Sequence, residues 1–478
     1  MEITAFLDIE KKYKLYEDTI EGIHYWNYSR FGIWHNYILK QNLELGTAQN
    51  QYQRSGIDKF KNYAELFWNS ASLGFGKITQ KDVCIINHPR KILIDGKYEC
   101  VYTDKLAQKL SNCITLERPY QMQHLKPQLL ENTQYLDILS VEKMVYYKWF
   151  TLACKNKYKS MLQVIERKIE VPLKEIQERY KIQLDIGYIV RYIAEQIVFY
   201  KASIKTVKKI VKNVKPKVLL EVVSYSLDCM MFTEVCKKTD IPVIELQHGI
   251  LTNHMAYNLN TDKKVEQIPD KILLFSDYWK KHMCWPGPKE NMISVGYPYF
   301  ERQVKATKII EEFKDKKNII FISQGTIGKK LSKLARELAE KMDGEKYRIL
   351  YKLHPGEYAI WQEQYPELKH NNIVILYDNK YALYDCFASS TAQVGVYSTA
   401  LYEGLGFGLS TYIYEMDIAK NMRDLCQSGY AKYVKDAEEL CSYMEQENIR
   451  KVEEDFWKSE ALEHMTSVVL KEIENSRQ

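Results

Sequence analysis

Four short stretches of the 478-residue chain place polar residues that could do chemistry directly after an apolar, strand-like segment. The first is Gln247, His248 and Gly249, which follow the segment 241–246. An imidazole has an unperturbed pKa of about 6.5, so His248 could accept a proton from an attacking hydroxyl near neutral pH. Gly249 would let the backbone turn sharply and come close to a ligand. The plainer interpretation is a histidine that only hydrogen-bonds a loop.

The second stretch, "ISQGTIGKK" (322–330), predicts a strand that turns into a helix through Gln324, Gly325 and Thr326. Backbone N–H groups at such a turn and at a helix start form an anion site. The spacing differs from a Walker phosphate-binding loop, and the closing Lys–Ser/Thr pair is missing. The alternative is an ordinary strand–helix turn.

The third stretch, "YKLHPGE" (351–357), places Lys352 and His354 at the tip of a strand, which Pro355 then ends. Side chains two residues apart in a strand point to the same side, so both cations could bind one phosphate. His354 could also donate a proton to a departing phosphate.

In the fourth stretch, "VGVYSTALYEGLGFG" (394–408), a strand ends and Ser398 and Thr399 open a short helix. Their hydroxyls could cap that helix or bind phosphate, because both uses depend on the same free N–H groups. Glu403 follows one turn later on the same helical face, where a carboxylate would suit ribose hydroxyls. The alternative is a capped helix with a surface glutamate.

These stretches belong to a strand–helix alternation that predicts an α/β fold with two parallel sheets, each covered by helices on both faces. Strands are expected near 82–87, 217–223, 241–246, 270–276 and 292–298, and in a second set near 318–323, 347–352, 372–377, 392–397 and 409–414. In such doubly wound sheets, ligands bind beyond the carboxyl ends of the strands, where all four stretches are expected to lie.

Composition narrows the class of protein. A hydrophobic content of 46% supports two or three domains with real cores. The 68 basic and 62 acidic residues leave a net charge of +6, too small and dispersed to indicate a nucleic-acid partner. No two of the ten cysteines have the spacing typical of zinc or redox motifs, so we expect reduced thiols. No Asp-x-Asp element supports a metal, and we expect neither a metal nor a separate cofactor.

The amino-terminal sequence "MEITAFLDIEKK" lacks a basic start followed by an apolar block, so we expect no signal peptide. No apolar stretch approaches the roughly 20 residues that span a bilayer. We expect a cytoplasmic protein, or one peripheral at the inner face of the cell membrane. The helical, lysine-rich segment Lys201–Lys217 could bind an anionic membrane surface, and the alternative is a solvated helix face packed on the domain.

Five segments, in this order, resemble the bacterial capsule and surface-polysaccharide glycosyltransferases of the GT-B fold: "IPVIELQHGI", "DKILLFSDYWKKHM", "ISVGYPYFE", "YKLHPGE" and "VYSTALYEG". The resemblance covers about residues 215–410. It extends to Kdo-transferring capsule proteins and, more distantly, to CDP-glycerol glycerophosphotransferases and bacterial sialyltransferases. It implies two facing Rossmann-like domains with additional N-terminal helices, the first for the acceptor and the second for a nucleotide-activated donor.

The resemblance also implies domain boundaries and roles. Residues 1–300 would form the acceptor-side domain with its helical additions, 301–455 the donor domain, and 456–478 a helix that could cross back to the first domain. By this resemblance, Lys352, His354, Ser398 and Thr399 would hold the donor phosphates and Glu403 would contact the ribose. Together with the residues of the other loop and turn described above, the predicted donor site comprises Gln324, Gly325, Thr326, Lys352, His354, Pro355, Ser398, Thr399 and Glu403. The acceptor side would comprise Gln247, His248 and Gly249.

We therefore expect a metal-independent glycosyltransferase that moves a sugar from a nucleotide-activated donor to a growing glycan or lipid-linked glycan. His248 and His354 are the catalytic candidates, and Glu221, within a strand, is an acidic candidate for the base that could equally be structural. A CMP-linked donor is one option, because Lys352 and His354 could neutralise the single phosphate of a leaving CMP. The alternatives are a polyol-phosphate transferase on the same fold, a nucleotide-sugar 2-epimerase, and an inactive binding or scaffold subunit.

Overall fold

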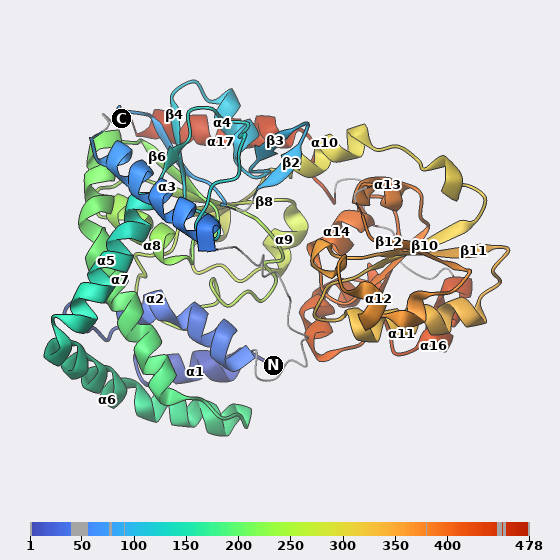
Figure 1. Ribbon diagram of the computed structural model, residues 1–478, viewed down its shortest axis with the longest axis horizontal. Coiled ribbons are helices and arrows are strands. Elements are labelled where there is room, and N and C mark those ends of the chain that lie inside the picture. The colour runs from blue at the N-terminus through green and yellow to red at the C-terminus, as the bar shows by residue number, and fades with distance from the viewer. Residues whose placement is uncertain are drawn as a thin grey trace. The chain divides into compact units, whose positions relative to one another are not determined.

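The computed structural model describes residues 2–39, 56–75, 79–89, 91–378, 380–446, 452 and 456–476. The chain divides into two compact units (Figure 1). Unit 1 contains the described residues up to Pro298 and those from Lys458 onward, and unit 2 contains Tyr299–Trp457. Each unit is built around its own parallel sheet.

The sheet of unit 1 has seven strands in the order β5-β4-β1-β6-β7-β8-β9, all paired in parallel. The strands are β1 (Val83–Ile86), β4 (Cys113–Glu117), β5 (Gln134–Tyr135), β6 (Val218–Glu221), β7 (Val243–Leu246), β8 (Lys271–Leu274) and β9 (Met292–Ser294). The central strands β1, β6 and β7 are buried along their whole length, as expected for a parallel sheet with both faces covered.

Alternating side chains of these strands enter two separate cores. Cys84 and Ile86 of β1 join a core with the helices α7 (Ile186–Val214) and α8 (Leu227–Lys237). Val83 and Ile85 face the other way, toward α4 (Asp104–Lys109) and the C-terminal helix α17 (Ala461–Asn475). The remaining helices of unit 1 include α1 (Thr4–Lys12), α2 (Tyr25–Gly32), α3 (Gly56–Phe75), α5 (Asp137–Leu152), α6 (Lys155–Tyr180) and α9 (Asp277–His282).

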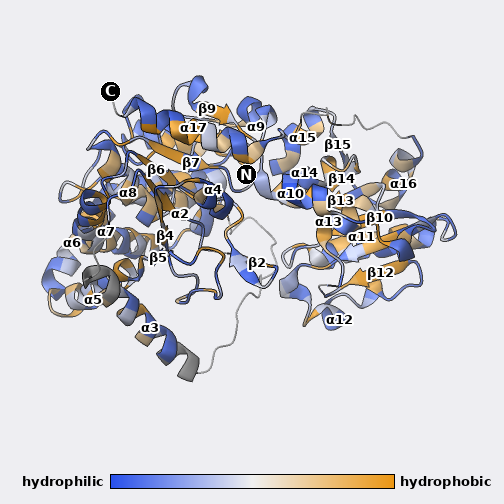
Figure 2. Cartoon of the chain, turned by 90° about the horizontal axis from the view of Figure 1, so that it is seen from above, coloured by the Kyte–Doolittle hydropathy of each residue, from blue (hydrophilic) through white to orange (hydrophobic). Residues whose placement is uncertain are grey.

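The sheet of unit 2 has six parallel strands in the order β12-β11-β10-β13-β14-β15. They are β10 (Lys317–Ile322), β11 (Tyr347–Lys352), β12 (Ile373–Leu376), β13 (Ala392–Gly395), β14 (Ser410–Tyr414) and β15 (Ala431–Val434). The helices include α10 (Pro298–Ala306), α11 (Gly328–Lys341), α12 (Trp361–Gln364), α13 (Leu383–Ala388), α14 (Thr399–Leu405), α15 (Arg423–Gln427) and α16 (Ala437–Gln446). Figure 2 shows apolar strands flanked by helices of mixed hydropathy.

Strand order reverses between β1 and β6 in unit 1 and between β10 and β13 in unit 2. In open parallel sheets, ligands bind outside the carboxyl ends of the strands at such a reversal. The predicted α/β fold with two Rossmann-like doubly wound units and N-terminal helices is confirmed. The sequence does not predict β4, β5, β15 or the hairpin of β2 (Ile92–Ile94) and β3 (Lys97–Glu99), because these strands are short and most of them mix polar with apolar residues.

Among the described helices, we find none with both the length and the hydrophobicity that a transmembrane span requires. All ten cysteines are unbridged thiols.

Candidate functional site

Three of the predicted loops of unit 2 lie on neighbouring strands. The sheet order places β10 between β11 and β13. Lys352 ends β11 and His354 follows it, the turn 324–326 follows β10, and Ser398 precedes the helix after β13. The predicted donor-site residues from these loops therefore share one edge of one sheet, at the reversal of strand order.

The loop after β10 is a tight turn into α11. The Gln324 carbonyl accepts hydrogen bonds from the N–H groups of Ile327 and Gly328, both at 2.9 Å. A side chain at Gly328 would not fit, because its Cβ would lie 2.5 Å from a Glu357 carboxylate oxygen. Gly328 therefore lets the turn approach the residues that follow β11, while Gln324 and Thr326 stay half-buried at the strand ends.

His354 caps the short 3-10 turn Pro355–Glu357, of which Pro355 itself is exposed. Its Nδ1 accepts a hydrogen bond from the Gly356 N–H at 3.1 Å. This bond assigns the ring proton of neutral His354 to Nε2, so the imidazole has an N–H donor on its other side. A proton on Nδ1 would face the Gly356 N–H and break the cap. The neutral ring is thus suited to donating a hydrogen bond to phosphate.

Glu357, which sequence reasoning missed, connects the ends of β10 and β11. Its buried carboxylate accepts hydrogen bonds from the Ser323 hydroxyl (2.9 Å), the Tyr365 hydroxyl (2.8 Å) and the backbone N–H of His354 (2.7 Å). Burial raises its pKa above the ordinary value, and the hydrogen bonds oppose that rise. A usable sequence signal is the spacing of a capping box, in which an acid follows the cap residue by three positions.

The Lys352 ammonium holds the loop that follows β12. Its Nζ donates to the carbonyls of Asp378 (3.1 Å) and Tyr381 (3.2 Å). Burial lowers its pKa from the ordinary value. Lys352 therefore has a structural role as well as a charge at the predicted site.

Ser398 caps α14, since its hydroxyl oxygen accepts a hydrogen bond from the Ala400 N–H at 3.2 Å. Thr399 is half-buried beside it. One turn further along α14, burial raises the pKa of Glu403 to about 7, while a hydrogen bond with Tyr384 opposes the shift. Glu403 can thus be a neutral donor or a charged acceptor close to physiological pH.

The strand ends of unit 1 bring together a second group of polar residues. His88 follows β1, Tyr225 follows β6 and His248 follows β7, and these strands are adjacent. The Tyr225 hydroxyl lies 3.0 Å from Nε2 of His248, and the His88 and His248 rings are 6.4 Å apart. The Tyr102 hydroxyl donates to the His248 carbonyl at 2.9 Å.

His248 is uncharged at neutral pH. Burial is the main reason that its pKa is lowered to about 3, and the neighbouring His254 and His88 lower it further. Its Nδ1 is buried, and no described residue hydrogen-bonds to it. The ring can accept a hydrogen bond or a proton, but the low pKa makes it a weak base until a negative charge comes near.

Sequence reasoning missed His88 and Tyr225. A His-Pro pair one residue after the strand "VCII" was available as a signal, because it matches the pair at His354. Tyr225 depends on an unusual backbone turn, in which Val223 adopts a φ of 63°. A β-branched residue rarely adopts this left-handed conformation, and no local sequence pattern predicts it.

The two residues beside His248 shape the loop. Gln247 is buried, and its amide nitrogen donates to the Gly249 carbonyl at 2.9 Å. Its amide oxygen accepts from the Phe275 N–H at 2.8 Å, which links the ends of β7 and β8. These bonds give the Gln247 side chain a positioning role.

Glu221 and Glu245 are buried register partners on β6 and β7. Glu221 accepts a hydrogen bond from the Thr233 hydroxyl at 2.8 Å, and burial raises its pKa well above the ordinary value. Glu245 accepts from the Ser224 N–H (3.0 Å), the Ser224 hydroxyl (2.6 Å) and the Tyr257 hydroxyl (2.6 Å). Burial raises the pKa of Glu245 to about 7. Glu245 thus fixes the turn that carries Tyr225 to His248.

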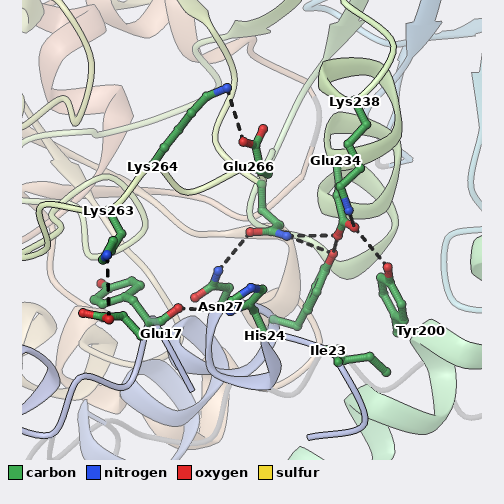
Figure 3. Close-up of a pocket in the computed structure, with 14 residues that line it drawn as sticks. Glu17, Ile23, His24, Asn27, Tyr200, Glu234, Lys238, Lys263, Lys264 and Glu266 are labelled. Atoms are coloured by element: carbon green, nitrogen blue, oxygen red, sulfur yellow. Dashed lines mark hydrogen bonds and ion pairs between the residues drawn. The ribbon is translucent and has the colours of Figure 1, made fainter. Parts of the chain in front are cut away.

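A cavity of about 470 Å³ in unit 1 lies apart from the predicted residues. Figure 3 shows Glu234 and Lys238, at the end of α8, and Tyr200 of α7 on one side, with Lys263, Lys264 and Glu266 on a loop. Glu234 accepts hydrogen bonds from Tyr28, Tyr200, Lys238 and Gln267. The end of α8 lies toward the amino edge of the sheet, so this cavity is not at the strand ends that carry His248.

Among the described residues, no group of three or more His, Cys, Asp or Glu side chains is arranged to hold a metal ion.

Comparisons with known proteins give structural likeness alone. No family model matches the chain, and no curated protein sequence matches it. A putative UDP-N-acetylglucosamine 2-epimerase from Listeria monocytogenes has a TM-score of 0.48 at 9% identity, over 84% of this chain and 97% of that chain. UDP-GlcNAc 2-epimerase from Neisseria meningitidis bound to UDP-GlcNAc has a TM-score of 0.45 at 10% sequence identity, and the match covers 81% of this chain and 99% of that chain. The wall teichoic acid polymerase TagF has a TM-score of 0.42 at 11% sequence identity, and the match covers 89% of this chain and 100% of that chain. These proteins share the GT-B-like plan of two sheets, and the conclusions on this chain's fold rest on its own sheets.

Proposed function

We propose that the protein is a metal-independent glycosyltransferase of surface-polysaccharide synthesis that uses a nucleotide-activated sugar. One observation carries the proposal. Three neighbouring strand ends at the reversal point of unit 2 hold a tight turn with the Thr326 hydroxyl (324–326), an imidazole donor (His354) and a capped helix start (Ser398). This set suits a nucleotide phosphate, because each member offers a hydrogen-bond donor and the helix start adds a partial positive charge.

In this proposal, the acceptor hydroxyl attacks the anomeric carbon of the donor sugar. A carbon–oxygen bond forms to the acceptor, and the bond between sugar and phosphate breaks. The charge that develops on the departing nucleotide phosphate is stabilised by the 324–326 turn and by the His354 Nε2–H. Glu403 would bind the ribose hydroxyls.

The acceptor proton needs a base, and in unit 1 we assign this role to His248. Its ring is neutral because burial lowers its pKa, so it can accept a proton. Its pKa of about 3 is too low for efficient catalysis by itself, so the role requires a bound anion that raises it. Tyr225, hydrogen-bonded to Nε2, would hold the orientation of the ring.

Calorimetric titration with CMP, CDP, UDP and GDP tests the donor site. We expect one nucleotide to bind, and Thr326→Val and Ser398→Ala to weaken it about tenfold or more. Ser390→Ala is the control, because the Ser390 hydroxyl bonds the Cys386 carbonyl just before β13, at the opposite edge of the same sheet. Absence of binding by every nucleotide, or equal weakening in the control, would contradict the proposal.

Transfer can be separated from epimerisation by using the cognate nucleotide sugar in D₂O. A glycosyltransferase releases the nucleotide in the presence of a glycan acceptor and leaves the C2 hydrogen of the sugar in place. A 2-epimerase that removes this hydrogen as a proton would incorporate deuterium at C2. Deuterium at C2 without sugar transfer would show that the protein is an epimerase and not a glycosyltransferase.

A further inference from the structure

One helix of unit 1 exposes an apolar stripe to solvent. Val145, Trp149 and Leu152 of α5 follow the i, i+4, i+7 spacing of one helical face. Trp149 is 51% exposed and Leu152 is 78% exposed. The opposite side of α5 is buried through residues such as Leu139 and Phe150, so the exposed face is not needed for the core of unit 1.

The helix that packs against α5 has a similar feature. α3 and α5 lie side by side (Figure 1), and Phe67 and Trp68 of α3 are exposed. Trp68 is 77% exposed. Exposed apolar side chains that form a continuous patch indicate a binding surface more often than isolated ones do.

The chain segment that carries the α5 stripe and continues into α6 is basic. From Lys143 to Ile165 the chain contains five lysines and no acidic residue. Lys143 pairs with Asp228, which leaves Lys148 within the stripe and three lysines just after it, at 155, 157 and 159. These four side chains are exposed, and none forms an ion pair with a residue that the structure describes. An apolar stripe edged by uncompensated cations matches the chemistry of an anionic lipid surface.

The lysine-rich end of α7 differs in this respect. Lys205, Lys208 and Lys212 are exposed there, but Val207 and Val211 of the same segment are buried in the core. That face carries cations, but its valines are buried and cannot enter a bilayer. The exposed face of α5 has both the cations and the apolar side chains.

We propose that the exposed stripe of Val145, Lys148, Trp149 and Leu152, together with the lysines at 155–159, docks unit 1 onto an anionic bilayer surface. The apolar side chains enter the headgroup region, and the lysine ammonium groups remain among the lipid phosphates. A second copy of the chain fits less well, because a two-fold contact through this stripe would bring identical cations together. The proposal does not depend on the donor or on the reaction.

Flotation with lipid vesicles tests this surface. The intact protein should float with phosphatidylcholine–phosphatidylglycerol vesicles at about 50 mM NaCl, and much less at about 500 mM, because salt screens the attraction. Vesicles of phosphatidylcholine alone should bind it weakly. The double variant Trp149→Ala/Leu152→Ala should reduce the bound fraction at least tenfold, and so should Lys155→Glu/Lys157→Glu.

Two controls keep the result specific. Ile309→Ala removes a side chain of unit 2 that is 54% exposed, and Lys208→Glu/Lys212→Glu reverses charge on α7. Both should float like the intact protein, and circular dichroism should show that every variant is folded. Failure of the intact protein to float at low salt would overturn the proposal, as would equal loss in the α7 variant. A concentration-dependent dimer that disappears in Trp149→Ala/Leu152→Ala would show that a second copy occupies the stripe instead.

Discussion

At the scale of single residues, His354 has two separate uses for its two ring nitrogens. Nδ1 accepts the Gly356 N–H and thereby caps the turn after β11. Nε2 then carries the proton, which can be donated in a hydrogen bond to a phosphate oxygen. The two uses can be separated by mutation, because an asparagine also caps such turns but has no imidazole.

We predict that His354→Ala lowers the rate of sugar transfer about 10²-fold, the effect expected when a donor to the leaving group is lost. His354→Asn should be almost as slow, although its melting temperature should stay close to that of the unmodified protein. Steady-state kinetics and thermal melts provide the two measurements. Full activity of His354→Asn would show that His354 contributes only the cap.

Glu245 links stability to pH. Its pKa is about 7 in the folded protein, against an ordinary value of 4.5, because the side chain is fully buried. The folded state therefore binds more protons than the unfolded state between these two values. The free energy of unfolding therefore falls as the pH rises from about 4.5 to about 7. The difference between the two pKa values corresponds to a loss of about 3 kcal/mol.

We predict that Glu245→Gln loses less stability than the unmodified protein when the pH is raised from 5 to 7.5, because glutamine does not ionise. Urea unfolding at the two pH values, followed by tryptophan fluorescence, measures the difference. Glu290→Gln is the control, since Glu290 is exposed in the same unit. An identical pH dependence of the unmodified protein and Glu245→Gln would show that the Glu245 carboxylate is ionised without cost.

At the scale of elements, the C-terminal helix α17 completes the core of unit 1. Its buried residues Met465, Val469 and Ile473 pack with the alternate side chains of β1 and β6. An ion pair between Lys271 and Glu472 joins the same helix to β8. The end of the chain thus covers one face of the first sheet.

We predict that Met465→Ala lowers the free energy of unfolding of unit 1 by about 2–5 kcal/mol, the usual cost of removing a buried methionine side chain. Leu470→Ala, one turn further along α17, is the matched control. Leu470 is 47% exposed, so its truncation should change stability by no more than about 0.5 kcal/mol. Equal effects of the two substitutions, measured by urea unfolding, would contradict the observed orientation of α17.

The elements that the sequence predicts are those with strong local patterns. Buried parallel strands read as apolar runs, so β6, β7 and β10 were recognisable by composition. The short strand β5 was not, because two residues give no periodicity. The capping role of Ser398 could be foreseen from its position, but the bond of Glu357 to Ser323 joins loops that are distant in sequence.

At the scale of the whole molecule, the alternation of strands and helices predicts two doubly wound units, because parallel strands require helical crossovers. The order of strands within each sheet is not encoded locally. For this reason His88, Tyr225 and His248 cannot be grouped from sequence alone, whereas the sheet order makes their strands neighbours. The roles of the grouped residues in catalysis remain predictions.

The proposed function requires that a nucleotide binds at the carboxyl edge of the sheet in unit 2. Hydrogen–deuterium exchange with and without the nucleotide that binds most tightly measures this directly, because bound phosphate should protect the N–H groups it accepts from. We predict slower exchange in peptides that cover 323–328 and 397–401, and no change in peptides that cover α8. Saturable nucleotide binding with protection confined to unit 1 would contradict a donor site in unit 2.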